Sequence, residues 1–342
     1  MNRVVGFGIV GCGMISKWHA EAAKNIEGAR LVGCFDLNTA NAKRFSEEHE
    51  CVCFATYEEM LASDEVDVVC ICTPSGLHAP LAVQAANAGK NIAVEKPMAI
   101  TKEQLEEVVA AVEANHVKAT VISQLRFTEA VQRVKRAVDS GQLGKILMAN
   151  VYMKYNRSQE YYSSSGWRGT FKMDGGGALM NQGIHGIDLL QYLAGSVKSV
   201  YALCRTLARD IEVEDTACLT VEYENGAIGT IQGTTSVEPG YPRQIEICGT
   251  RGTVVLEEDE IVRWDVDGKS LTPEEIKKTS AEGFSDPGAI ATKYHMLQLE
   301  DLVRAILDDG QTVVNVYEGR KAVDIILAAY ESSSLGQKVD LR

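Results

Sequence analysis

The amino-terminal stretch V-G-F-G-I-V-G-C-G-M-I, residues 5–15, decides the fold of this chain. An apolar, strand-like run leads directly into Gly11-x-Gly13-x-x-Ser16, and a helix-compatible segment follows. This order of strand, glycine turn and helix is typical of a dinucleotide-binding βαβ unit. Gly11 permits the tight turn, and Gly13 allows the backbone to approach a pyrophosphate that faces the amides of the helix start. Ser16 stands where Gly or Ala is usual, and it is small enough to fit.

The next strand identifies the cofactor. Residues 30–35 have a strand-like pattern and end at Asp36, at the distance where an acid accepts hydrogen bonds from the adenosine ribose. No arginine follows within Leu37-Asn38 to hold a 2′-phosphate, and the carboxylate of Asp36 would repel that group. The sequence therefore predicts NAD rather than NADP, with Met14 and Ile15 of the glycine turn in contact with it.

Composition excludes several classes of function. The 342 residues suffice for two domains, and 45% hydrophobic with 24% charged residues is typical of a soluble globular protein. A net charge of −13 argues against nucleic acid and anionic membranes as partners. The nine cysteines include two C-x-C pairs but no C-x-x-C, so we expect no metal site and no disulfide framework. The expected location is the cytoplasm.

The chain has two parts of different character. Over residues 1–122, strand-like runs alternate with helical patterns, which predicts a doubly wound parallel Rossmann sheet with the cofactor at the carboxyl ends of its strands. Over residues 123–342, hairpin signals such as Glu224-Asn225-Gly226 join successive strand-like runs. This part is predicted to be an α+β domain on a largely antiparallel open sheet, with helices over residues 127–140, 177–194, 294–307 and 317–335.

Three further motifs combine with the glycine turn. Thr73-Pro74-Ser75-Gly76-Leu77-His78 follows the fourth predicted strand, Glu95-Lys96-Pro97 follows the fifth, and G-G-G-A-L-M-N-Q-G-I-H-G-I-D occupies residues 175–188. Together they resemble the glucose–fructose oxidoreductase/inositol dehydrogenase family, Gfo/Idh/MocA, over essentially the whole chain. The resemblance implies a Rossmann domain followed by an α+β domain whose open sheet mediates oligomers, so we expect a homodimer or homotetramer through the C-terminal sheet.

Lys96 is the first candidate catalytic residue. A lysine at the carboxyl end of a parallel strand, held by Pro97, projects into the nicotinamide crevice, where its ammonium can stabilise a developing alkoxide. The resemblance gives the matching lysine this role, in contact with cofactor and substrate. Glu95 either orients Lys96, contacts the nicotinamide end or is a satisfied edge carboxylate. Thr73 and Pro74 are expected beside the nicotinamide ribose.

Histidines supply the other candidates. His78 either contacts the cofactor or fixes its loop. His185 is the candidate base, because an imidazole with a pKa near 6.5 accepts a hydroxyl proton at neutral pH. Asn181, His185 and Asp188 share one face of the predicted helix, and Asp188 either orients the imidazole or pairs with a neighbouring segment. Many inositol dehydrogenase-like relatives have Asp at the position of Asn181. An amide cannot take up a proton, so Asn181 is expected to position a sugar hydroxyl.

The substrate side is predicted from the segment before the glycine run, which resembles a branch of the family acting on sugars and nucleotide sugars. Trp167 offers an apolar face to a pyranose. Arg157 and Arg168 either hold hydroxyls or a carboxylate bidentately, or tie their loop to backbone carbonyls. Because each arginine has a structural role as its alternative, the two are thin evidence for an acidic substrate, and the sequence slightly favours a neutral or mixed sugar.

The predicted function is therefore an NAD-dependent oxidoreductase. It interconverts a secondary alcohol of a sugar, sugar acid, nucleotide sugar or cyclitol with the corresponding ketone by hydride transfer. One alternative is an enzyme that retains NAD and cleaves a glycosidic bond by transient oxidation. A second alternative, a non-catalytic NAD-sensing protein, is disfavoured by the presence of both Lys96 and His185.

Overall fold

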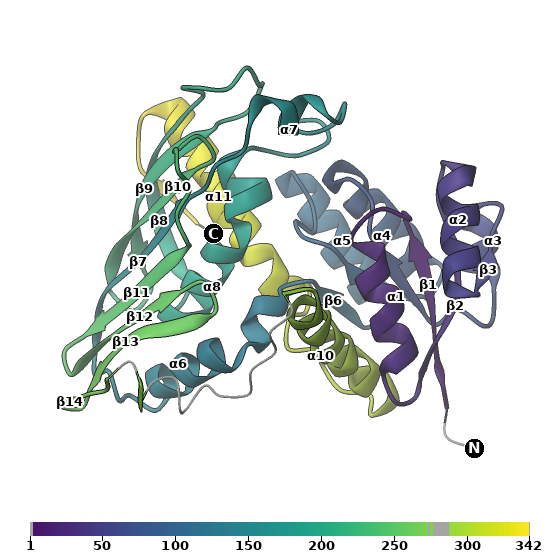
Figure 1. The fold of residues 1–342 in the computed structure, drawn as a ribbon, viewed down its shortest axis with the longest axis horizontal. Coiled ribbons are helices and arrows are strands. Elements are labelled where there is room, and N and C mark those ends of the chain that lie inside the picture. Colours follow the sequence, from purple (N-terminus) through teal and green to yellow (C-terminus); the bar gives the residue numbers. More distant parts are fainter. Residues whose placement is uncertain (1–2, 273, 276–286, 342) are drawn as a thin grey trace. The chain divides into compact units, whose positions relative to one another are not determined.

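The computed structural model describes residues 3–272, 274–275 and 287–341. Within them the chain forms two compact units (Figure 1). The first comprises the described residues up to Gln124 together with those from Pro287 to Arg320. The second comprises the described residues from Leu125 to 275 and those from Lys321 onwards.

The first unit is built on a six-stranded parallel sheet with the order β3-β2-β1-β4-β5-β6. All six residues of β1 are buried, as expected for a central strand covered on both faces. This strand order is that of a Rossmann sheet, so the predicted doubly wound fold is confirmed. The strands are β1 (Val5–Val10), β2 (Ala29–Phe35), β3 (Val52–Cys53), β4 (Val68–Ile71), β5 (Asn91–Val94) and β6 (Ala119–Val121).

Helices connect these strands, and side-chain caps define where several begin. The side chains of Asn38, Thr56 and Thr101 accept hydrogen bonds from backbone amides in the first turns of α2, α3 and α5. A short 3₁₀ turn, residues 75–77, precedes the fourth helix. The helices are α1 (Ser16–Asn25), α2 (Thr39–His49), α3 (Tyr57–Ala62), α4 (His78–Asn87) and α5 (Lys102–Ala114).

A late segment returns to the first unit. Helix α10 (Pro287–Leu307) packs against α1, and its residues Leu299, Leu302 and Val303 belong to the same apolar core as β1. The segment after it adds to the sheet edge, because the amide of Val121 in β6 donates to the carbonyl of Val314 at 2.9 Å. The expected single second domain over residues 123–342 is therefore corrected. The apolar face of α10 completes the first unit rather than the second.

The second unit is built on a nine-stranded sheet with the order β14-β13-β12-β11-β7-β10-β9-β8-β15. Strands β7 and β10 are parallel and the other neighbouring pairs are antiparallel, so the predicted largely antiparallel sheet is confirmed. The last three strands of the following list were not predicted from the sequence. The strands are β7 (Ile146–Lys154), β8 (Val197–Arg205), β9 (Thr216–Tyr223), β10 (Ile228–Thr234), β11 (Gln244–Gly249), β12 (Gly252–Glu257), β13 (Glu260–Val266), β14 (Lys269–Ser270) and β15 (Val339–Asp340).

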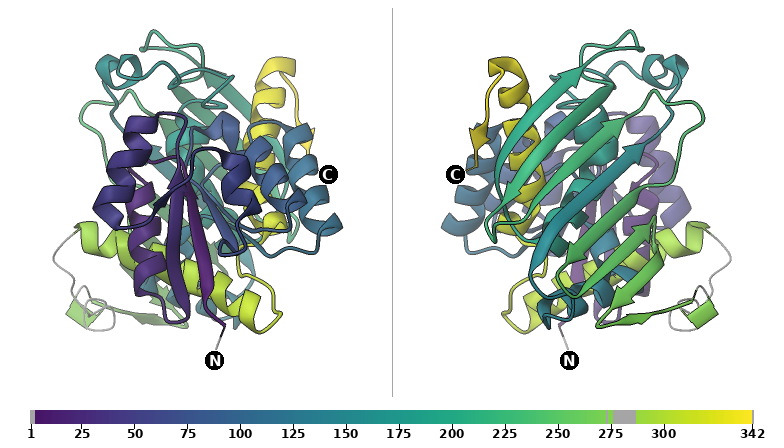
Figure 2. Two further views of the ribbon diagram at one scale, coloured as in Figure 1. Left: turned by 90° about the vertical axis from the view of Figure 1, so that its right-hand side faces the viewer. Right: turned by 90° about the vertical axis from the view of Figure 1, so that its left-hand side faces the viewer.

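Helices of the second unit cover one face of this sheet (Figure 1). They are α6 (Glu129–Asp139), α8 (Ile184–Ala194) and the part of α11 (Val316–Leu335) from Lys321 onwards. The short helix α7 (Gln159–Ser163) follows β7. The opposite face is seen with its strands in front in the right-hand view of Figure 2. The helix predicted over residues 177–194 is only partly correct, because residues Ala178–Gly183 form a π-helix before α8 begins. Among the described residues, no helix is long and apolar enough to span a bilayer.

Candidate active site

The glycine turn between β1 and α1 has the geometry that its sequence predicts. Gly11 has φ +86°, and a Cβ there would lie 2.8 Å from the carbonyl oxygen of Cys72. A Cβ on Gly13 would meet no protein atom within 4 Å, so the backbone there is open to approach by a phosphate. The buried hydroxyl of Ser16 donates to the carbonyl of Gly13 at 2.7 Å, and serine at the third position of the motif is accommodated without a clash.

Asp36 lies at the end of β2 beside this turn. One carboxylate oxygen accepts from the amide of Cys12 at 2.7 Å, and the other accepts from the amide of Asn38 at 2.7 Å. Each oxygen retains accepting capacity, which suits two ribose hydroxyls. The structure thus brings Asp36 together with the glycine turn. Met14 of that turn is 79% exposed.

His78 is buried at the start of α4 and links two loops. Its Nδ1 lies 2.7 Å from the carbonyl oxygen of Pro97, and its Nε2 lies 2.8 Å from that of Thr73. Burial lowers the pKa of His78 despite these two carbonyls. Of the two alternatives for His78, the structure supports loop fixation, because both ring nitrogens face backbone oxygens. His78 thus ties the Thr73 loop to the Lys96-Pro97 loop, and its contact with the cofactor stays a prediction.

Glu95 is a buried carboxylate and not an edge group. Its Oε1 accepts from Nε2 of His19 at 2.9 Å and lies 3.7 Å from Nε2 of His295. Its Oε2 accepts from the amide of Lys96 at 3.3 Å. Both histidines are buried, and neither was singled out from the sequence, because nothing in their spacing indicates contact with residue 95. Lys96, the next residue, is partly buried.

In the second unit, close packing requires glycine at two positions of the run Gly175-Gly176-Gly177, and Gly175 has a positive φ of 82°. A Cβ on Gly177 would lie 1.8 Å from the carbonyl oxygen of Glu214, and a Cβ on Gly176 would lie 2.1 Å from the hydroxyl of Tyr330. The Glu214 carboxylate accepts from the amides of Gly177 and Leu179 and from Tyr330. Burial raises the pKa of Glu214, although these hydrogen bonds oppose the shift.

The π-helix changes the expected alignment of Asn181, His185 and Asp188. Asn181 lies in the wider π turn and donates to the buried carboxylate of Asp174, while His185 lies half-buried in the first turn of α8. Asp188 pairs with Arg126 through two hydrogen bonds of 2.8 and 2.5 Å. Of the two alternatives for Asp188, the structure supports pairing with a neighbouring segment. Asp174 and Arg126 were not predicted, although Asp174 directly precedes the glycine run.

The predicted substrate-side residues share a polar cluster. Arg157 donates to the side chain of Gln182 at 2.7 Å, and Gln182 donates to the hydroxyl of Tyr161 at 3.0 Å. The guanidinium of Arg168 lies over the rings of Tyr161 and Trp167, with its carbon 4.3 and 5.5 Å from their centroids. Its Nε is buried and has no hydrogen-bond partner within the described part of the chain. Both arginines also donate to backbone carbonyls, Arg157 to that of Asn156 at 2.8 Å and Arg168 to that of Tyr161 at 3.2 Å. The alternative in which they tie their loop is therefore supported for both.

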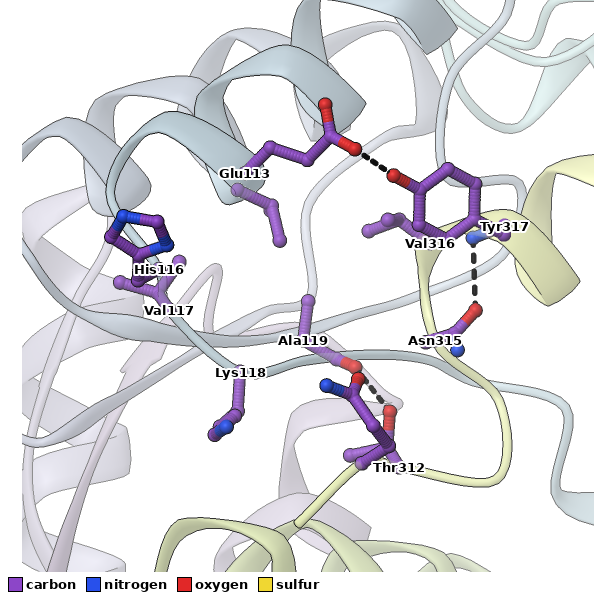
Figure 3. A pocket seen from close by; sticks show the side chains of 11 residues that line it. Glu113, His116, Val117, Lys118, Ala119, Thr312, Asn315, Val316 and Tyr317 are labelled. Carbon is purple, nitrogen blue, oxygen red and sulfur yellow. Dashed lines mark hydrogen bonds between the residues drawn. The ribbon is translucent and has the colours of Figure 1, made fainter. Parts of the chain in front are cut away.

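A pocket of about 300 Å³ lies elsewhere in the first unit (Figure 3). It is lined by Lys118 and Ala119 at the amino end of β6, whereas a Rossmann sheet binds its cofactor at the carboxyl ends. Several of its polar groups are already paired: Tyr317 donates to Glu113, and Thr312 donates to the carbonyl of Ala119 at 2.6 Å. This pocket is distinct from the glycine turn.

The described geometry yields two separate groups of candidate residues. The first unit brings Gly11, Gly13, Asp36 and Thr73 together and places Glu95 and Lys96 at the end of β5. The second unit brings Asn181 and Gln182 into the same cluster as Arg157. The pairing of Lys96 with His185 on one substrate remains a prediction.

Comparison with known proteins supplies the family. Residues 5–123 match the model of an oxidoreductase family with an NAD-binding Rossmann fold, and residues 131–255 match the GFO/IDH/MocA C-terminal domain. The WlbA dehydrogenase of Chromobacterium violaceum, solved with NADH and UDP-GlcNAcA, is 34% identical, with a TM-score of 0.90 and coverage of 100% of this chain and 97% of that one.

Two further relatives span nearly full length. The WlbA dehydrogenase of Bordetella pertussis, also solved with NADH and UDP-GlcNAcA, is 32% identical with a TM-score of 0.91, covering 100% of this chain and 99% of that one. Inositol 2-dehydrogenase of Rhizobium meliloti is 25% identical over 98% of this chain and 99% of its own length. The chain belongs to the Gfo/Idh/MocA family and is an NAD-dependent oxidoreductase acting on sugar-like alcohols.

Proposed function

We propose that this protein oxidises a secondary hydroxyl of a nucleotide-linked sugar acid with NAD. The chain is similar over its whole length to two dehydrogenases solved with UDP-GlcNAcA, and this similarity supports the substrate class. Their sequence identities of 34% and 32% exceed the 25% identity of the inositol dehydrogenase. An acidic substrate departs from the slight preference for a neutral sugar in the sequence analysis, where the two arginines were too weak a signal for an acid.

Lys96, His185 and Asn181 each have a separate role in the proposed reaction. Lys96, at the end of β5, polarises the reacting oxygen and stabilises its developing negative charge. His185, in the first turn of α8, takes the hydroxyl proton. Asn181 carries no proton and orients a substrate hydroxyl. The glycine turn and Asp36 fit a bound NAD, which supplies the hydride acceptor.

The position of Arg168 supports the acidic substrate. Arg168 holds its guanidinium against Tyr161 and Trp167 and keeps a buried Nε without a partner in the described residues. A carboxylate accepting from the partly exposed guanidinium forms a charge-assisted hydrogen bond, while the neighbouring rings offer apolar area to a pyranose.

The test is a comparison of paired substrates. NADH formation is measured in single- and multiple-turnover reactions with UDP-GlcNAcA, with UDP-GlcNAc as the matched sugar lacking the carboxylate, and with myo-inositol. We expect oxidation of UDP-GlcNAcA. Arg168→Ala should weaken the affinity for it by about 10- to 150-fold, the equivalent of about 1.5–3 kcal/mol, and have little effect on UDP-GlcNAc. Turnover of inositol alone, or an equal effect of Arg168→Ala on both nucleotide sugars, would contradict the proposal.

We further propose a homodimer or homotetramer formed through the uncovered face of the nine-stranded sheet. Half-exposed apolar side chains on that face support it, namely Met148, Tyr201, Leu203 and Ile228. We also propose a cytoplasmic location. The amino-acid composition described in the sequence analysis supports it, and so do the free thiols of all nine cysteines.

A further inference from the structure

Three buried titratable side chains meet at Glu95, the residue before the candidate catalytic residue Lys96. His19 lies on α1, Glu95 directly follows β5, and His295 lies on α10. One oxygen of Glu95 lies 2.9 Å from Nε2 of His19 and 3.7 Å from Nε2 of His295. All three side chains are at least nine-tenths buried. The cluster lies wholly within the first unit.

Burying three titratable side chains costs free energy, so this cluster contributes little to the stability of the core. Burial alone would raise the pKa of Glu95, but the hydrogen bonds and charges of His19 and His295 outweigh it and hold that pKa well below its usual range. Glu95 is therefore a buried anion. Apolar residues of similar volume would stabilise a core at least as well as a buried ion pair does.

The geometry of Glu95 indicates what the anion does. Its second oxygen, Oε2, accepts from the backbone amide of Lys96 at 3.3 Å. The Glu95 carboxylate thus faces the imidazoles of His19 and His295 through Oε1 and accepts from the backbone amide of Lys96 through Oε2. His295 is in turn held by ring contacts, with its centroid 5.4 Å from that of Trp18 and 5.6 Å from that of His19.

We propose that His19 and His295 are positioning residues for the reaction: they fix the carboxylate of Glu95, which fixes the backbone of Lys96 at the end of β5. This inference rests on the role of Lys96 in the proposed function. It makes α10, a helix far along the chain, a contributor to the placement of the catalytic group.

Variants matched in size test the inference, with the nucleotide sugar that gives NADH in the screen above. Gln at position 19 places its amide nitrogen near the position of Nε2, whereas Asn is too short to reach Glu95. We expect His19→Asn and His295→Asn to lower kcat by about 10- to 100-fold, in line with the effect of a misplacement of about 1 Å. KM and the Kd of NADH should change less than about twofold, and His19→Gln should retain about a third of kcat or more.

His49→Asn is the control, because His49 is also a buried histidine of this unit but contacts Phe45 and Glu21 instead. It should leave kcat unchanged. Thermal unfolding of each variant reports loss of fold separately from loss of rate. If His19→Gln and His19→Asn lower kcat equally, or if either changes the Kd of NADH as strongly as kcat, the proposed link to Lys96 is wrong.

Two further measurements separate the inference from its alternatives. In a Lys96→Ala background, His19→Asn should have no additional effect on the residual rate; an additive loss would show that His19 does not act through Lys96. Stoichiometric metal in the purified protein that is lost in His19→Asn would identify the cluster as a metal site and overturn the proposal. Undiminished turnover in Lys96→Ala itself would instead contradict the proposed function.

Discussion

Asp36 is held in place by two backbone amides, and this fixes its carboxylate where an adenosine ribose is expected. We expect Asp36→Ser to narrow the preference for NAD over NADP at least about tenfold, or about 1.4 kcal/mol. The substitution removes acceptors for the ribose hydroxyls and also removes a charge that repels the 2′-phosphate. Comparing kcat/KM for the two cofactors measures the change.

Asp64→Ser, which replaces an exposed acid elsewhere in the first unit, is the matched control and should leave the ratio unchanged. Equal use of NAD and NADP by the unmodified protein would show that Asp36 has no part in selecting the cofactor.

Individual residues were predictable to different degrees. Gly11, Gly13 and Asp36 were found because a turn and the next strand end carry a local signal. His19 and His295 were missed, because their contact with Glu95 joins segments that are distant in sequence. For His78, the sequence located the loop correctly but could not show that both ring nitrogens face backbone carbonyls.

The π-helix is the element on which the second unit's candidate residues depend. It begins directly after Gly177, whose missing Cβ allows the chain to pass the carbonyl of Glu214. We expect Gly177→Ala to destabilise the protein by about 1–3 kcal/mol, as overpacked substitutions do, measured by denaturant unfolding. Gly166→Ala is the matched control, since a Cβ there meets no atom within 4 Å and its φ is not positive. Equal stability of the two variants would contradict the packing argument.

The loop after β8 is held by a single buried carboxylate. Asp215 accepts from the amides of Leu207, Ala208 and Arg209 at 2.7–3.0 Å. Burial would raise its pKa, but these hydrogen bonds and one from Thr216 lower it below the usual value. A lowered pKa in the folded state means that the stabilisation is complete above the unfolded-state pKa of about 3.9 and is lost as pH falls through the folded value.

The corresponding variant is Asp215→Asn. It should lower the unfolding temperature at pH 7, and its difference from the unmodified protein should shrink as the pH falls below about 4. Unfolding curves from pH 7 to pH 3 measure both effects. A difference that grows toward acid pH would show that the carboxylate is not stabilising the loop.

Elements were predicted well where a period and a boundary signal coincide. The helix predicted over residues 317–335 matches α11 (Val316–Leu335) to within one residue. The predicted helix over residues 177–194 was wrong in its first part, because a π turn depends on close packing with Glu214 and Tyr330 and not on local pattern. Strand β15 was missed because two residues are too few to show a period.

At the scale of the whole molecule, the uncovered face of the nine-stranded sheet is the candidate for self-association. We expect the unmodified protein to sediment as a dimer or tetramer, and Leu203→Glu combined with Ile228→Glu to shift it toward monomer, because buried charges without partners oppose association. Val52→Glu places a charge on a similarly exposed apolar residue of β3 and should not change the sedimentation. A monomer at all concentrations would contradict the proposed assembly.

The division of the molecule was only partly predictable. The sequence predicted a boundary after residue 122, close to the observed one after Gln124. It did not predict that residues 287–320 belong to the first unit, because an amphipathic helix does not reveal which core its apolar face joins.

The return of α10 to the first unit has a consequence for the newborn chain. A ribosome adds roughly 5–20 residues per second, so α10 is completed roughly 9 to 37 seconds after β6. During that interval the apolar core that β1 and α1 share with α10 lacks Leu299, Leu302 and Val303. Strands β7 to β14 are translated meanwhile and are free to assemble first. The first part of the protein to be synthesised is therefore among the last to be finished, and a nascent chain arrested before α10 exposes an apolar surface that chaperones would recognise.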